Sequence, residues 1–312
     1  MSKNRSRYKR VATLSRLMAD LAVIGHVAVD RVITHREDRT QLGGPPTFVS
    51  VVCQRLGRSV EAATKVGGDL PAEFASRLRE LGIHREGVVI DDAETTRFVL
   101  DYRGTDRSLS VESVCEEIGP EDILELPEVM LLAPIVGEVP ASTVSSIDAD
   151  VIALDPQGFL RNIRPDGSIM PRRWFDEGLL RRLTIYKSSE EELRLITEDA
   201  NTLRGLERII RLGAEVAVAT MGGEGALLVT RRGRFRVPAL EISEVLDPTG
   251  AGDAFMGALF SVYMDGEEPL WCASMGAAMA SCVVETLGAR IDASLKQVEE
   301  RAEDVYNRAV RL

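Results

Sequence analysis

Histidine and cysteine are both scarce in this chain of 312 residues, and their scarcity excludes two kinds of site. The three histidines are not paired on any expected helix, so we expect no zinc site. The four cysteines include no C-x-x-C pair and are too few for a disulfide scaffold, which is typical of the reducing cytoplasm. No apolar run approaches the length of a membrane span. We therefore expect an ordinary soluble, cytoplasmic protein.

Acidic residues outnumber basic residues, 49 to 38, and the net charge of -11 argues against a nucleic-acid or membrane partner. The first ten residues are an exception, because they contain Lys3, Arg5, Arg7, Lys9 and Arg10. No apolar segment follows them, so they are not a secretory signal. We expect residues 1–19 to be a basic, solvated tail, with a nucleic-acid or membrane arm as the alternative and Met18 as an alternative start.

Three familiar nucleotide-binding motifs are also missing. There is no G-x-x-x-x-G-K-S/T loop, no protein-kinase H-R-D or D-F-G pair, and no strand-linked G-x-G-x-x-G with a following acidic residue. What the chain does contain is D-P-T-G-A-G-D-A-F at residues 247–255, a glycine turn that leads into an amphipathic helix. Gly250 and Gly252 allow the backbone N–H groups to point at one spot, where the start of a helix also favours an anion.

Asp253 stands where this turn meets the helix. A carboxylate repels a bound phosphate, unless its task is to take a proton from the hydroxyl that attacks the phosphorus. The combination of an anion-binding turn and a carboxylate therefore favours a kinase. The structural alternative is an aspartate that caps a helix after a glycine turn.

Short apolar runs alternate with helical patterns along the rest of the chain. We expect strands at residues 21–25, 61–65, 129–133, 151–155, 184–187, 216–220 and 225–230. We expect helices at residues 47–56, 72–81, 190–196 and 203–212, and from residue 257 to the end. Asp69 and Pro71 stand where a cap and a first-turn proline would begin the second of these helices. This order predicts an α/β fold with a doubly wound sheet.

The alternating polar and apolar residues 95–111 predict a hairpin. Together with residues 27–42, this hairpin would form a small β lid. We expect a single domain over residues 20–312, with lid segments near 27–42 and 95–112.

The string at residues 247–255 resembles the C-terminal signature of the ribokinase-like (PfkB) family of carbohydrate and nucleoside kinases. L-G-G-P-P-T-F at residues 42–48 resembles the N-terminal glycine-pair signature of the same family, and T-K-V-G-G-D at residues 64–69 resembles one of its strand-end segments. The resemblance spans about residues 20–291. It implies a ribokinase-like fold, with a central, mainly parallel sheet flanked by helices on both faces and a small β lid. It also implies an ATP-dependent small-molecule kinase.

The resemblance further implies which residues meet the reacting groups. Asp253 would deprotonate the acceptor hydroxyl. The transferring phosphoryl group would be stabilised by the backbone of Gly250, Ala251 and Gly252. The hydroxyls of the acceptor would be bound by Asp30, Gly43, Gly44 and Gln157.

Other segments would hold the nucleotide and the ions. K-S-S-E-E-E at residues 187–192 aligns with the N-x-x-E element of the family, with Ser189 in place of the asparagine and Glu192 as the glutamate that organises Mg²⁺ through water. An acidic first turn of a helix is the alternative. T-M-G-G-E-G at residues 220–225 resembles a nucleotide contact, although a tight hairpin turn would give the same string; its candidate residues are Thr220, Gly222, Gly223 and Gly225. Asp247 and Thr249 match residues that hold a monovalent cation in many relatives, so K⁺ is expected beside ATP and Mg²⁺.

The sequence favours a neutral polyol as the acceptor. The first glycine signature continues as P-P-T-F at residues 45–48, with no lysine or arginine for a substrate phosphate and without the asparagine common in ribokinases. Residues 42–48, 151–161 and 187–189 look like the inositol-kinase branch of the family, so myo-inositol is expected first. A sugar such as ribose or fructose, or a nucleoside, is the alternative. A catalytically inactive ligand-binding relative and a nucleotide-binding dehydrogenase are further alternatives, and a homodimer remains open.

Overall fold

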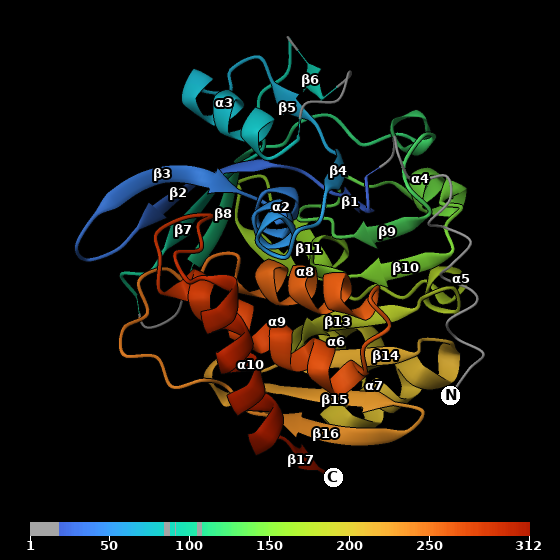
Figure 1. Ribbon diagram of the computed structural model, residues 1–312. Helices are drawn as coiled ribbons and strands as arrows, with labels where there is room; N and C mark the ends of the chain where they lie inside the picture. The colour runs from blue at the N-terminus through green and yellow to red at the C-terminus, as the bar shows by residue number, and fades with distance from the viewer. Residues whose placement is uncertain (1–18, 84–87, 91, 105–107) are drawn as a thin grey trace.

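The computed structural model describes residues 19–83, 88–90, 92–104 and 108–312, so the predicted basic tail lies outside the described residues except for Ala19. The described chain contains a nine-stranded central sheet with the order β17-β16-β15-β14-β13-β10-β9-β1-β4 (Figure 1). Its strands are β1 (Leu21–Ile24), β4 (Val60–Ala63), β9 (Val129–Leu132), β10 (Val151–Leu154), β13 (Ile185–Ser189), β14 (Val216–Thr220), β15 (Ala226–Thr230), β16 (Gly233–Val237) and β17 (Val310–Arg311).

Six of these strands, from β14 to β4 in the sheet order, run parallel, and β15, β16 and β17 extend one edge antiparallel. After β4 the chain crosses to the other side of β1 to form β9, so the order of the strands reverses there. The carboxyl ends of parallel strands at such a reversal form the usual ligand crevice of doubly wound sheets.

The side chains of the central strands alternate between two hydrophobic cores. In β1, Leu21 and Val23 belong to one core, and Ala22 and Ile24 belong to the other. The first core includes residues of α2 (Pro45–Arg55), α8 (Ala251–Tyr263), α9 (Pro269–Val284) and α10 (Leu295–Arg308). The second includes residues of α4 (Ala141–Ser146), α5 (Glu177–Leu180), α6 (Glu190–Thr197) and α7 (Thr202–Leu212). Helices therefore cover both faces of the sheet, and the predicted α/β fold is confirmed (Figure 1).

A second sheet, which we call the lid sheet, has four strands in the order β3-β2-β7-β8. Its strands are β2 (Ala28–Ile33), β3 (Asp38–Gly43), β7 (Arg97–Asp101) and β8 (Ser108–Ser113). β7 and β8 pair antiparallel, as expected for a hairpin, although residues 105–107 of its turn lie outside the described part of the chain. Val32, Phe98 and Leu100 of this sheet pack against Ile135 and Val136, which follow β9. The lid sheet is thereby anchored beside the carboxyl ends of the central strands.

Two local predictions are wrong. The chain is not continuously helical after residue 257, because α8, α9 and α10 are separate helices and residues 310–311 form β17, which pairs with β16. Asp69 does not cap α3 (Ala72–Glu80), whose N-cap is Pro71. Asp69 instead accepts hydrogen bonds from Thr95 and pairs with Arg97, at 2.6 Å. The remaining short strands are β5 (Val66–Gly67), β6 (Val89–Ile90), β11 (Arg161–Ile163) and β12 (Ile169–Pro171). Among the described helices, none has the length and apolarity that crossing a membrane requires.

Candidate active site

A pocket lies between the lid sheet and the carboxyl ends of the central strands. It brings together predicted site residues from four segments of the chain, namely Asp30, Gly44, Gln157, Thr249, Gly250 and Asp253. The rest of its wall is mainly apolar and includes Phe48, Phe98, Leu100, Leu109 and Ile135. Arg161 also lines it, and sequence reasoning did not single out this cation.

Asp253 lies in the first turn of α8 and is half-buried at the wall of this pocket. Gln157 donates from Nε2 to Asp253 Oδ1 at 3.1 Å, and Arg161 donates to Gln157 Oε1 at 2.9 Å. Burial and the nearby carboxylate of Asp155 raise the pKa of Asp253 to about 7. A carboxylate with a pKa near neutrality suits general-base catalysis, because it is both available and basic enough at that pH.

The glycine turn before Asp253 has no room for larger side chains. Gly250 is the N-cap of α8 with φ of 76°, and a Cβ added there would fall 2.3 Å from the ring of Phe48. A Cβ on Gly252 would fall 2.8 Å from Lys187 Nζ. Gly250 supplies no side-chain cap, and the N–H of Ala251 donates to the carbonyl oxygen of Pro248 at 3.3 Å, so the N–H groups of Gly252 and Asp253 are the ones available to an anion. With Gly250 as the N-cap, the alternative in which Asp253 caps the helix does not hold.

Lys187 is a site residue that the sequence analysis missed. It lies in the middle of β13, is 5% exposed, and places Nζ 2.6 Å from Asp155 Oδ2. Burial alone would lower the pKa of Lys187, but the carboxylates of Asp155, Glu192 and Asp253 raise it, so the amine stays protonated. A buried positive charge therefore lies against Gly252. The signal in the sequence was a lysine at the last position of the expected strand 184–187.

Ser189 and Glu192 begin α6 together. Ser189 Oγ accepts from the backbone N–H of Glu192 at 3.2 Å, and Glu192 Oε2 accepts from the backbone N–H of Ser189 at 2.8 Å. This reciprocal capping box is a structural role for both residues and occupies one oxygen of the Glu192 carboxylate. The other oxygen of the Glu192 carboxylate is left to accept a hydrogen bond from the water of a hydrated metal ion.

The predicted nucleotide contact lies outside the pocket wall, at the turn between β14 and β15. Thr220 pairs in register with Ser189, so the turn lies next to the start of α6 along the same edge of the sheet. A Cβ on Gly222 or Gly223 would meet open space, whereas one on Gly225 would fall 2.1 Å from a backbone oxygen of β16. Gly225 is therefore required by packing, and the open surface is at Gly222 and Gly223.

Asp30 and Gly44, the second glycine of the pair, also line the pocket. Asp30 is buried on β2, and a Cβ on Gly43 would fall 1.9 Å from Asp30 Oδ2. Gly43 is thus required by Asp30 and is not itself part of the wall. Gly44 has φ of 83°, and a Cβ there would fall 2.2 Å from the carbonyl oxygen of His26. The glycine pair lets the start of α2 approach both the lid sheet and the end of β1.

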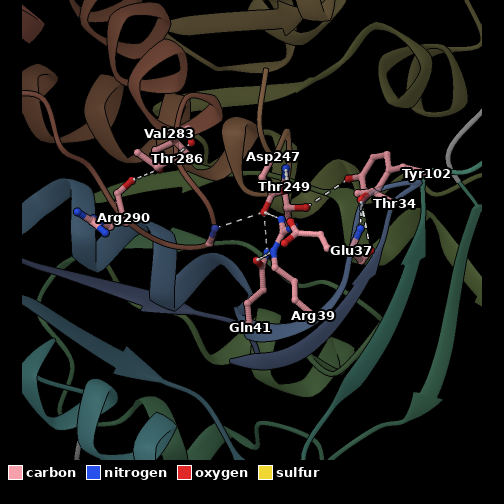
Figure 2. A network of polar contacts seen from close by, with 11 residues as sticks. Thr34, Glu37, Arg39, Gln41, Tyr102, Asp247, Thr249, Val283, Thr286 and Arg290 are labelled. Atoms are coloured by element: carbon pink, nitrogen blue, oxygen red, sulfur yellow. Dashed lines mark hydrogen bonds and ion pairs between the residues drawn. The ribbon is translucent and has the colours of Figure 1, made fainter. Parts of the chain in front are cut away.

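Protein groups surround the two residues predicted to hold a monovalent cation (Figure 2). Arg39 NH2 lies 2.9 Å from Asp247 Oδ2, and Gln41 Nε2 donates to the same oxygen at 2.8 Å. The backbone N–H of Thr249 donates to Asp247 Oδ1 at 2.9 Å, and the hydroxyls of Thr249 and Tyr102 are 3.3 Å apart. Burial alone would raise the pKa of Asp247, but hydrogen bonds from Thr249 and Gln41 and the neighbouring guanidinium of Arg39 lower it.

Comparison with known proteins agrees with this geometry. Residues 142–296 match the pfkB family of carbohydrate kinases. Cytidine kinase of Thermococcus kodakarensis is 29% identical over 283 residues, covering 87% of this chain and 98% of that protein. Inositol 3-kinase of Arabidopsis thaliana is 27% identical over 261 residues, covering 79% of this chain and 68% of that protein. A pyrophosphate-dependent kinase in the ribokinase family, solved with a pyrophosphate analogue and myo-inositol, superposes with a TM-score of 0.75 at 20% identity, covering 91% of this chain and 100% of that chain.

Proposed function

This chain belongs to the PfkB family of carbohydrate kinases, and we propose that it transfers a phosphoryl group from ATP to a hydroxyl of a small neutral polyol, with myo-inositol as the preferred acceptor. At the coarser level it is a ribokinase-family phosphotransferase that acts on a hydroxyl of a sugar, nucleoside or inositol. The observation that carries the proposal is Asp253, a carboxylate with a pKa of about 7 in the pocket wall, beside a glycine turn and a buried lysine.

In the proposed reaction the acceptor lies between Asp30 and Asp253. Asp253 takes the proton of the attacking hydroxyl, whose oxygen forms a bond to phosphorus while the bond from phosphorus to the leaving phosphate oxygen breaks. Gln157 orients the carboxylate of Asp253 through its amide. The N-terminus of α8 and the charge of Lys187 stabilise the negative charge on the transferring group.

The residues present fit a magnesium nucleotide. Asp155 Oδ1 is buried and has no hydrogen-bond partner among the described residues, and Glu192 contributes to the same electrostatic cluster around Lys187. Carboxylate oxygens are the donors that Mg²⁺ prefers, usually with several waters retained. Mg²⁺ held there would neutralise the phosphates of the nucleotide. Gly222, Gly223 and Thr220 would then lie along the rest of the donor.

Two features of the pocket support a neutral acceptor. Arg161 is the cation in the pocket wall, but it donates to the carbonyl oxygen of Ile135 at 2.7 Å and to Gln157 Oε1 at 2.9 Å. Its guanidinium therefore binds groups of the protein rather than a substrate phosphate. The other polar side chains that line the pocket, among them Asp30 and Gln157, suit hydroxyls. A nucleoside is the second candidate, because Phe98 and Leu100 of the lid sheet give the pocket an apolar wall that suits a planar base.

The proposal also covers the setting of the enzyme. The four cysteines are buried and unpaired, which agrees with work in the reducing cytoplasm. Every residue in the proposed reaction belongs to one chain, so the proposal holds for a protomer and for a homodimer.

A measurement of kcat/KM decides the substrate. The panel is myo-inositol, ribose, fructose, fructose 6-phosphate, cytidine and adenosine, each with ATP and with pyrophosphate as donor. We expect myo-inositol with ATP to exceed the others by at least about tenfold, which is about 1.4 kcal/mol in transition-state binding. A tenfold preference for a nucleoside or a phosphosugar would reject the inositol assignment and keep the kinase. Turnover with pyrophosphate alone would reject ATP as the donor.

A further inference from the structure

The carboxylate of Asp247 is paired with a guanidinium from the lid sheet. Arg39, on β3, approaches Asp247 Oδ2 to 2.9 Å, and the two side chains are only 16% and 1% exposed. Arg39 is itself held in place, because Nε donates to Gln41 Oε1 at 3.1 Å and the guanidinium also pairs with Glu37. Figure 2 shows this arrangement between the strand and the loop that precedes α8.

The donors around Asp247 do not fit a monovalent metal ion. Such an ion is held by a shell of oxygen atoms that replaces its water. The groups that approach the Asp247 carboxylate are instead the guanidinium of Arg39, the amide of Gln41 and the N–H groups of Thr249 and Gly288, at 2.8 to 3.4 Å. All of them carry positive charge or a hydrogen-bonding proton, so they would repel a cation at this carboxylate.

We propose that the guanidinium of Arg39 takes the place of the monovalent cation, so that the enzyme works without K⁺. The guanidinium of Arg39, which also pairs with Glu37, supplies the positive charge beside Asp247, and the Asp247 carboxylate orders the loop of residues 247–252 through the N–H of Thr249. This inference rests on the proposed kinase function. Arg39 is a positioning residue, since it acts on the phosphoryl site only through Asp247.

The same contacts connect the lid sheet to the glycine turn. Arg39 and Gln41 lie on β3, and Tyr102 directly follows β7, so two strands of the lid sheet contact Asp247 and Thr249. β3 also ends at Gly43, beside Asp30. A guanidinium carried by the lid sheet therefore charges the turn only when the lid sheet is in place over the acceptor pocket, whereas a diffusible ion would bind independently of it.

The first test is the response of the wild-type enzyme to K⁺. Turnover is measured in a buffer whose only other cations are Mg²⁺ and tetramethylammonium, with and without about 0.1 M KCl, at constant ionic strength so that screening is matched. We expect a change of less than about twofold, because no coupling free energy connects the ion to the site. Activation of the wild type by more than about fivefold would overturn the proposal.

The second test removes the guanidinium. Arg39→Ala leaves Asp247 without a positively charged partner, so we expect turnover to fall about tenfold or more and K⁺, but not tetramethylammonium, to restore part of it. K⁺ should also raise the melting temperature of Arg39→Ala and not that of the wild type, because a ligand stabilises the state that binds it. Arg36→Ala is the matched control, since Arg36 precedes the same strand and pairs with Glu244 on the surface, with 84% and 58% of the side chains exposed.

The outcomes separate the two proposals. An Arg39→Ala protein that ignores K⁺ in both turnover and melting would overturn the role of Arg39. If that variant does not fold, Arg39→Gln is measured in the same way, and the wild-type response to K⁺ decides independently. A wild type that phosphorylates no acceptor would contradict the proposed function, while the melting comparison would still test whether Arg39 replaces the ion.

Discussion

Asp247 and Asp253 lie at the two ends of one glycine turn, and their surroundings act in opposite directions. Asp247 meets a guanidinium, an amide and a backbone N–H, which lower its pKa. Asp253 meets the carboxylate of Asp155 and an apolar pocket, which raise its pKa to about 7. Two identical side chains in one signature thus become an ionised anchor and a base that can exchange a proton near neutrality. The environment, more than the residue type, assigns the role.

The strongest test of this comparison is Asp253→Asn. We expect kcat to fall about 10²-fold to 10⁴-fold, the usual contribution of a general base. The fold should become more stable at pH 8, since the raised pKa means that ionising the native carboxylate costs stability as the pH rises from the unfolded value of 3.8 through about 7. Turnover and thermal melting at pH 8 measure both effects. Near-normal turnover would refute the role of Asp253 as base.

The middle of the turn is tested by Gly252→Val. The added side chain would enter the space of Lys187 Nζ, 2.8 Å from the new Cβ, and would block the approach of a phosphoryl group to the backbone. We expect a loss of at least about 10²-fold in kcat, similar to removal of one oxyanion donor. Circular dichroism and thermal melting check that the variant folds like the wild type. If it does not, Gly252→Ala, which adds a smaller side chain at the same position, is measured instead. Full activity in a folded variant would contradict the anion site.

Asp247→Asn should reverse the stability effect seen at the other end of the turn. The lowered pKa of Asp247 means that its ionised form stabilises the fold above the unfolded value of 3.8 and that this contribution is lost as the pH falls through the lower native value. We expect a loss of about 1 to 3 kcal/mol in unfolding free energy at pH 7, because Arg39 loses its charged partner. Denaturant unfolding at pH 7 checks the sign. A variant more stable than the wild type would contradict it.

The smallest expected effect is on the pH profile. If Asp253 is the base, kcat/KM should fall about tenfold for each unit of pH below about 7, because only the deprotonated carboxylate accepts the proton. Asp247 should contribute nothing in this range, since its pKa lies below its ordinary value. The profile is measured over about 3.5 pH units, from roughly pH 5.5 to pH 9, which brackets the expected midpoint. A flat profile across pH 7 would show that another group sets the rate.

Local patterns predicted much of this fold. The apolar runs of β1, β9 and β14 were visible because strands buried on both faces need an unbroken apolar sequence. Asp253 and Gly250 could be predicted as site residues because both belong to one short motif, the glycine turn that leads into a helix. The ends of the helices were predicted less well, because the expected helix from residue 257 to the end is in fact divided into α8, α9 and α10.

The missed residues share a physical reason. Gln41 and Asp247 are 206 residues apart, and no local pattern brings β3 to the loop before α8. Lys187 looked like the polar end of a strand, and only the folded sheet places it against Gly252. Arg161 looked like a loop residue, and its role follows from its contact with Gln157. The contacts of Gln41 and Lys187 join segments that are far apart in the sequence, so no local pattern shows them. The contact of Arg161 spans four residues, but it depends on the conformation of the chain after β10.

The buried cysteines have a practical consequence for following the lid sheet. Burial raises the pKa of the Cys53 thiol to about 12, and it also raises the pKa values of Cys115, Cys272 and Cys282. A thiol reacts as its thiolate, so the native protein should take up alkylating reagents slowly. A fluorophore on a cysteine introduced at the exposed Arg36 would therefore report from that position alone. The fluorescence of this probe could then follow the lid sheet during turnover without first removing any native cysteine.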